Sequence, residues 1–95
     1  MAAYVIGRVN VTNPDAYGEY TKRSPGAIEA NGGKFIARGG AVETLEGEEE
    51  TRRMVIVEFP SFEQAKVFYD SEIYRDARSY REGAAEMQFV IVDGV

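Results

Sequence analysis

The side chains of this chain that could do chemistry are arginines, carboxylates and tyrosines, because its 95 residues include no cysteine, histidine or tryptophan. This composition excludes thiol nucleophiles, disulfides, zinc sites built from cysteine and histidine, and histidine-centred triads. Any proton transfer would fall to a carboxylate, a phenol, a lysine or water. Any binding of an anion would favour arginine, whose planar guanidinium matches a carboxylate.

The first candidate cluster is Arg38, Glu58 and Arg8, which alternation along three expected strands places on one face of a sheet. A charge directed into a partly apolar space is unfavourable unless it is paired. Arg38 could therefore pair with Glu58, bind the anionic group of a ligand, or exchange between them. The alternative is a structural ion pair that fixes strand register or dimer geometry. If a proton is moved, a desolvated Glu58 would be the general base.

The second candidate cluster is Ser71, Tyr74, Arg78 and Arg81. Tyr74, Arg78 and Arg81 are spaced four and three residues apart, which places them in one row of a helix. A hydroxyl, a phenol and two guanidiniums would form a clamp for an anion or an enolate. The alternative is that Ser71 caps the helix, Tyr74 lies at the edge of the core and the arginines are solvated. For Arg78 we favour the solvated interpretation.

Two further motifs have simpler interpretations. Gly39 and Gly40 follow Arg38, and a glycine pair lets backbone N–H groups approach an anion, but it also makes a plain β-bulge. Four carboxylates between the second and third strands could attract a hard cation, but their spacing matches no calcium loop. They are Glu46, Glu48, Glu49 and Glu50. We predict a solvated hairpin tip and no metal site.

The strands that must position these residues are read from β-branched residues and from alternation. We expect them at Ala3–Val11, Lys34–Arg38, Arg53–Phe59 and Met87–Val92, and Ala41–Leu45 could continue the second one. The glycine pair at 39–40 is expected to interrupt this second strand as a bulge or a sharp bend.

Three helical segments lie between the strands. Asn13 and Pro14 are a good N-cap and first position, and Pro25 predicts a kink or break near Ser24. A second helix begins at Ser61, and Gln64, three positions later, can complete a capping box. A further helical turn begins at Ser71. Its expected apolar stripe is Ile73, Ala77, Tyr80 and Ala84.

The order strand, helix, strand, strand, helix, strand predicts an α+β protein with the ferredoxin-like, split βαβ arrangement. A chain of this length forms one domain, which we place at residues 1–95. The helices of the two βαβ halves must then cover one face of a four-stranded antiparallel sheet.

The other face of the sheet is predicted to be about half apolar, which a solvated face would not be. Its expected residues are Tyr4, Ile6, Arg8, Lys34, Ile36, Arg38, Met54, Ile56 and Glu58. We therefore predict a homodimer in which two sheets pack face to face. The enclosed space could hold a small-molecule ligand, or the apolar residues could simply fill it.

The net charge of −5, from 11 basic and 16 acidic residues, argues against binding to nucleic acid or to an anionic membrane. No apolar stretch approaches the length of a membrane span. The apolar run Met1–Gly7 has no basic region before it and does not match a signal peptide. We expect a cytoplasmic location.

The chain also resembles a bacterial family called domain of unknown function 1330. The resemblance is carried in order by Gly32–Gly40, Glu46-Gly47, Glu58–Ser61, Ala65, Phe68–Ser71, Tyr74 and Arg81. It implies a ferredoxin-like fold and a dimeric α/β barrel, but no agreed activity, and it favours a role for Arg81. Two departures are Phe68, where tryptophan is common, and Ser71–Tyr74, where a Ser-Pro-Glu-Tyr pattern is common.

Relatives in the wider superfamily include cofactor-free oxygenases and ligand-binding proteins, so the resemblance implies no required cofactor. One hypothesis is a small enzyme that binds an organic anion or an oxygenated aromatic between sheet and helices, held by Arg38 and Arg81. The second is a ligand-binding module without turnover, and the third is a purely structural dimer. Gly39, Ser71, Tyr74 and Arg8 complete the expected ligand-binding set.

Overall fold

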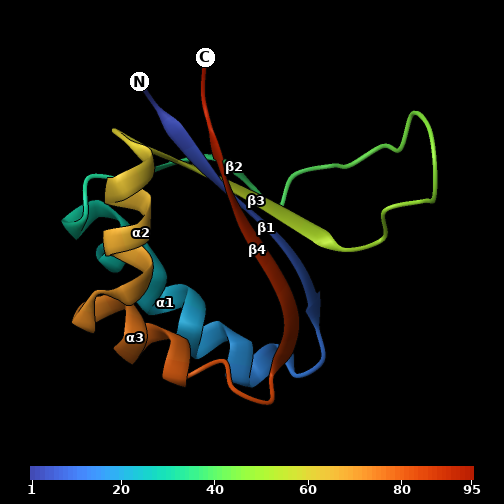
Figure 1. The fold of residues 1–95 in the computed structure, drawn as a ribbon. Coiled ribbons are helices and arrows are strands. Elements are labelled where there is room, and N and C mark those ends of the chain that lie inside the picture. Colours follow the sequence, from blue (N-terminus) through green and yellow to red (C-terminus); the bar gives the residue numbers. More distant parts are fainter.

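The computed structural model describes residues 1–95, which form a four-stranded antiparallel sheet covered by three helices on one face (Figure 1). The elements are β1 (Ala3–Val11), α1 (Pro14–Ala30), β2 (Lys34–Arg38), β3 (Arg53–Phe59), α2 (Phe62–Asp70), α3 (Glu72–Ser79) and β4 (Ala85–Asp93). The strand order is β2-β3-β1-β4, with every neighbouring pair antiparallel. The predicted ferredoxin-like fold is confirmed.

The segment between β2 and β3 differs from the prediction. Residues 41–45 do not continue β2; they belong to a long irregular loop that projects from the sheet (Figure 1). Leu45 in this loop is 86% exposed, so no packed layer lies against it that could hold a strand there.

The core lies between the sheet and the helices. Its buried side chains are Val5, Val9, Tyr17, Tyr20, Ala27, Ile28, Val57, Phe59, Ala65, Phe68, Tyr74, Ala77 and Ala84. Phe68 joins β3 to α3, with its ring centroid 4.8 Å from that of Phe59 and 4.2 Å from that of Tyr74. Each buried aromatic side chain stabilises the fold by about 1.5–3 kcal/mol.

Helix α1 starts as the sequence predicts, because the Asn13 side chain accepts a hydrogen bond from the N–H of Ala16 at 3.2 Å. Of the predicted kink or break near Ser24, the break is wrong: the helix continues through Pro25 to Ala30. Buried residues on both sides of the proline pack into the same core, and this packing outweighs its local cost. They are Tyr17, Tyr20 and Ser24 before it, and Ala27 and Ile28 after it.

The second and third helices begin at serine caps. Ser61 accepts from the N–H of Gln64 at 3.0 Å. The amide of Gln64 donates instead to the carbonyl of Asn31 at 2.9 Å, so it joins α2 to the end of α1 rather than closing a capping box. The stripe predicted for α3 is wrong at Ile73 and Tyr80, which are exposed, because Tyr74 occupies the side that faces the core.

A β-bulge in β2 changes which face its last residues occupy. Phe35 pairs with Val57 as expected, but Ala37 pairs with Ile56 and Arg38 with Val55, with the register shift between Phe35 and Ala37. A shift of one residue exchanges the two faces of a strand. Arg38 therefore lies on the helix-covered side, and its predicted place on the uncovered face is wrong.

The bulge has two other consequences. Ala37 pairs with Ile56, a residue of the uncovered face. The interruption lies before Gly39 and Gly40 rather than at them. Gly39, with φ +68°, ends the strand and donates its N–H to the carbonyl of Met54 at 2.8 Å.

The uncovered face keeps most of its predicted members. The side chains that lie on it are Tyr4, Ile6, Arg8, Lys34, Met54, Ile56 and Glu58, with Val90 and Val92 added by β4. Val90, Val92 and Ile36 are 41%, 47% and 51% exposed. This face carries an apolar centre with charged residues towards its margins.

Replacing Gly7 should destabilise the fold. Gly7 is buried in β1, and a Cβ there would collide with the ring of Phe89, which lies directly on the strand. We expect Gly7→Ala to lower the free energy of unfolding by about 1–3 kcal/mol through overpacking. The measurement is urea denaturation. The matched control is Gly18→Ala in α1, which meets no atom within 4 Å and should raise stability. Wild-type stability in Gly7→Ala would contradict this account.

Candidate functional site

A small cavity lies between α1 and the helix-covered face of the sheet, and we call it the inner cavity. It encloses about 30 Å³, roughly the space of one water molecule. Its walls are mostly apolar and aromatic. The polar groups that reach it come from Tyr17, Tyr20, Thr21, Ser24, Arg38, Arg53, Tyr69 and Tyr74.

A larger groove of about 350 Å³ runs between α2 and β4, and we call it the outer groove. Lys66 and Asp70 of α2 line it, together with Arg81. Four residues line both spaces: Val5, Tyr69, Met87 and Phe89. The two spaces are therefore separated by shared side chains rather than by backbone.

Three arginines lie beside these spaces without an acidic partner. Arg38 and Arg53 line the inner cavity and Arg81 lines the outer groove, and none of them forms an ion pair with a carboxylate. The Nε–H groups of Arg53 and Arg81 are buried and donate to no acceptor within the protein. Arg53 and Arg81 are half-buried, and a guanidinium with unused donors is a ready site for an oxyanion.

Each of these arginines is held by its surroundings. Arg38 Nη2 donates to the carbonyl of Thr21 at 3.2 Å, and its Cζ lies 4.5 Å from the centroid of the Phe35 ring. The Cζ of Arg81 lies 5.2 Å from the ring centroid of Tyr20 and 5.5 Å from that of Phe89. These carbonyl and cation–π contacts partly compensate the lost hydration of the guanidiniums.

Arg53 depends on the glycine that follows Arg38. A Cβ at Gly39 would lie 2.7 Å from Arg53 Cζ, so any larger residue would have to displace this guanidinium from its position. The N–H of Gly39 is already bonded to Met54, as described above, which leaves it no donor for a ligand. Gly39 thus makes space for an arginine and does not itself supply the expected anion contact.

The positive charges of the three arginines all affect the pKa of the Tyr17 phenol. Burial raises the pKa of Tyr17 above its usual value, and the charges of Arg53, Arg81 and Arg38 each oppose this increase. All three guanidiniums therefore act on the same place. A negative group near this phenol would be stabilised by them.

Behind Tyr17 lies a buried pair of phenols. The hydroxyls of Tyr20 and Tyr74 are 2.6 Å apart and share one hydrogen bond. Burial, followed by the neighbouring Tyr74, raises the pKa of Tyr20 far above its usual value. Burial lowers the pKa of Arg81, but the phenols of Tyr74 and Tyr20 more than offset this, so its pKa is raised. Around neutral pH the Tyr20 phenol is therefore neutral and the Arg81 guanidinium is charged.

The structure brings Arg38, Tyr74 and Arg81 of the predicted set to the helix-covered side. It places Glu58 on the opposite face, where its carboxylate pairs with Lys34 Nζ at 3.2 Å. The predicted cluster of Arg38 with Glu58 and Arg8 is therefore wrong, because the bulge turned Arg38 away. From this position Glu58 cannot reach a ligand held between sheet and helices.

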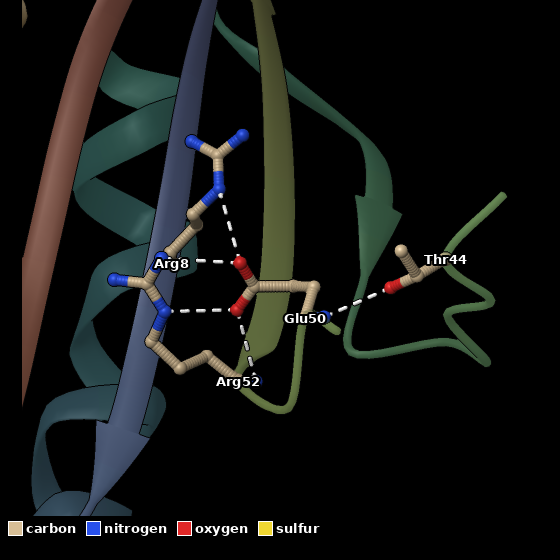
Figure 2. A network of polar contacts seen from close by, with 4 residues as sticks. All are labelled: Arg8, Thr44, Glu50 and Arg52. Atoms are coloured by element: carbon tan, nitrogen blue, oxygen red, sulfur yellow. Dashed lines mark hydrogen bonds and ion pairs between the residues drawn. The ribbon is translucent and has the colours of Figure 1, made fainter. Parts of the chain in front are cut away.

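Arg8 is engaged elsewhere on the uncovered face. Figure 2 shows Glu50 between two arginines, with its carboxylate 3.6 Å from Arg8 Nε and 2.8 Å from Arg52 Nε. The backbone N–H of Glu50 donates to the hydroxyl of Thr44 at 2.8 Å. Hydrogen bonds from Arg52 and the charge of Arg8 lower the pKa of Glu50. This network fixes the projecting loop to β1.

Ser71 and Arg78 line neither space. Ser71 caps α3: its hydroxyl donates to the carbonyl of Phe68 at 2.7 Å and accepts from the N–H of Tyr74 at 3.3 Å. The guanidinium of Arg78 stacks on Tyr69, with Cζ 4.1 Å from the ring centroid. Its Nε is buried, so the expectation of a fully solvated arginine is wrong. The acidic residues form no group that could hold a metal ion.

Arg53 is the site residue that the sequence interpretation missed. It lies two and four residues before Val55 and Val57, and alternation alone places all three on the helix-covered face. Tyr17 and Tyr20, which belong to neither predicted cluster, are both buried and line the inner cavity.

The chain belongs to the family described as domain of unknown function (DUF1330), whose model matches residues 2–95. Two solved structures are similar to this chain in fold. A protein of unknown function from Rhodopseudomonas palustris is 24% identical, with a TM-score of 0.73 over 99% of this chain and 82% of that one. SnoaB, a cofactor-independent oxygenase from Streptomyces nogalater, is 8% identical, with a TM-score of 0.70 over 99% and 93%.

A third structure is described as a dimeric protein of unknown function with a ferredoxin-like fold, from Bacteroides fragilis. It is 12% identical, with a TM-score of 0.59 over 98% of this chain and 96% of that one. At these identities the likenesses show the fold alone. No curated protein matches the chain. None of its helices combines the length and apolar character needed to cross a bilayer, and the cytoplasmic location stays a prediction.

The buried phenol predicts a loss of stability at high pH. Tyr20 ionises near pH 10 in the unfolded chain but only at much higher pH in the fold. Its stabilising effect is complete below about pH 10 and declines as the pH rises beyond that value. Urea denaturation at pH 8 and pH 11 should show this decline, and Tyr20→Phe should reduce it. A variant that declines as steeply as the wild type would rule Tyr20 out as the cause.

Proposed function

We propose that this protein binds a small organic acid with an apolar or aromatic body between its sheet and its helices. The observation that carries the proposal is the group of three guanidiniums, Arg38, Arg53 and Arg81, beside a tyrosine-lined space with no carboxylate paired to them. A protein of net charge −5 has many acidic residues available, yet none neutralises this group.

The sizes of the two spaces suggest how such a ligand lies. The inner cavity has room only for a small head group, whereas the outer groove is within the range of small-molecule sites. The acid group would approach Tyr17, where the three guanidiniums act together. The apolar body would lie along Phe89 and Ile91 in the groove.

Cofactor-independent turnover of the bound acid is the second candidate function. The fold is shared with SnoaB, although that likeness extends to the fold only. The observation in its favour is the Tyr20–Tyr74 hydroxyl pair with Arg81 against it, which offers a proton and a positive charge at one place. Proton transfer would then use these phenols rather than Glu58.

We also propose that the protein is a homodimer through the uncovered face of the sheet. Six apolar side chains lie on that face: Tyr4, Ile6, Met54, Ile56, Val90 and Val92. The charged residues beside them are already paired within the chain, as Lys34 with Glu58 and Arg8 with Glu50. An apolar face with neutralised margins suits a second copy of itself. The Bacteroides fragilis protein with this fold is described as dimeric.

A screen of small carboxylates, phenols and sulfonates by thermal shift tests the binding proposal. A ligand at 100 times its dissociation constant should stabilise the fold by about 2.7 kcal/mol. We expect the shift to be lost in Arg38→Gln and in Arg81→Gln, because each removes a donor to the acid group. Arg8→Gln, on the uncovered face, is the matched control and should keep the shift. Equal shifts in all three variants would refute the proposed site.

The dimer is tested by one charge at the centre of the uncovered face. We expect Ile56→Glu to convert the protein to monomers, because an unpaired carboxylate would be desolvated at the interface. Light scattering after gel filtration gives the mass. Val67→Glu is the control, since Val67 is 56% exposed on α2, away from that face. A wild-type protein that is monomeric, or an Ile56→Glu dimer, would count against the interface.

A further inference from the structure

We propose that Pro25 is a positioning residue for the anion site, because it leaves the Thr21 carbonyl free to hold Arg38. The inference rests on the proposed function, in which Arg38 binds the acid group of the ligand. It gives a functional reason for a proline that lies in the interior of α1 and interrupts the hydrogen bonding of this helix.

The first step of the argument is backbone geometry. In an α-helix each carbonyl accepts from the N–H four residues later, and for Thr21 that residue is Pro25. Proline has no N–H, so the helix cannot supply this donor. The Thr21 carbonyl instead accepts from Arg38 Nη2 at 3.2 Å, although Arg38 lies on β2, 17 residues further along the chain.

The second step is how the guanidinium is held. The β-bulge brings Arg38 to the helix-covered side, and Phe35 supports its Cζ at 4.5 Å from the ring centroid. The bond to Thr21 then fixes its direction. A guanidinium has five N–H donors, and this bond uses one of them, which leaves the others for an oxyanion. Arg38 itself is exposed, so without this contact its long side chain would be free to move.

The third step is the energetic cost at position 25. Proline is the least favourable residue in a helix interior, and alanine there would restore an N–H to the Thr21 carbonyl. That N–H would compete with Arg38 for the same acceptor. A helix optimised for stability alone would avoid this proline, so stability and anion binding should respond in opposite directions when it is replaced.

The experiment is an NMR titration with benzoate, an aromatic carboxylate of the proposed class. It compares benzoate binding by the wild type, Pro25→Ala, Arg38→Gln and the double variant from their backbone amide signals. It also reads the side-chain N–H signals of Arg38 in the two proteins that keep this residue. We expect Pro25→Ala to bind benzoate about threefold to tenfold more weakly, the cost of ordering one free long side chain. The Arg38 guanidinium should rotate more freely, while the thermal unfolding temperature stays equal or rises.

Two comparisons make the result specific. In the Arg38→Gln background Pro25→Ala should have no further effect on benzoate binding, because Pro25 acts only through Arg38. A general structural effect would instead add to that of Arg38→Gln. Pro14→Ala is the matched control: Pro14 is the first residue of α1, and four residues before it lies Asn10 in β1, so no helical carbonyl is freed.

The outcomes separate the two proposals. Unchanged benzoate affinity in Pro25→Ala, with weaker binding in Arg38→Gln, would overturn the positioning role and leave the anion site standing. Unchanged affinity in Arg38→Gln would instead refute the role of Arg38 in the proposed function. Additive losses in the double variant would show that Pro25 acts on the fold as a whole and would overturn the inference.

Discussion

The constraint on which this structure depends is the placement of three guanidiniums beside the inner cavity and the outer groove, with no carboxylate paired to any of them. Such charges are unfavourable when hydration is lost and nothing replaces it. Here Arg38 has a helix carbonyl and the ring of Phe35, and Arg81 has the rings of Tyr20 and Phe89. Arg53 has the space left by a glycine. The donors that stay unused are those that a ligand could satisfy.

The two faces of the sheet deal with charge in opposite ways. On the uncovered face each cation has a carboxylate, as Lys34 with Glu58 and Arg8 with Glu50. On the helix-covered side the cations of the site have none. This division lets one small sheet support two tasks: a neutralised apolar surface for self-association and a positive space for an organic acid. Both tasks are proposals, and both depend on the face of the sheet on which Arg38, the last residue of β2, lies.

Much of the fold could be predicted from local patterns. Asn13, Ser61 and Ser71 cap helices in the structure as their types and positions indicate. The site was predicted less well. Tyr74 and Arg81 were predicted together from helical spacing, but α3 ends at Ser79 and Arg81 lies in the turn that follows. Arg53 was missed, although the alternation of β3 could have shown it. Glu58 was wrongly grouped with Arg38, because the alternation of side chains along β2 was extended through a bulge.

The sequence by itself determined the strands, the helix caps, the ferredoxin-like order of elements and the absence of thiol and imidazole chemistry. These follow from residue types and spacings over a few positions, where backbone preferences and side-chain periodicity act. Only the tertiary structure decided on which face Arg38 lies and that Thr21 is its acceptor. A bulge is set by how β2 pairs with β3, and the freed carbonyl matters only once a strand brings a donor to it. Pairing between distant segments is not encoded in either segment alone.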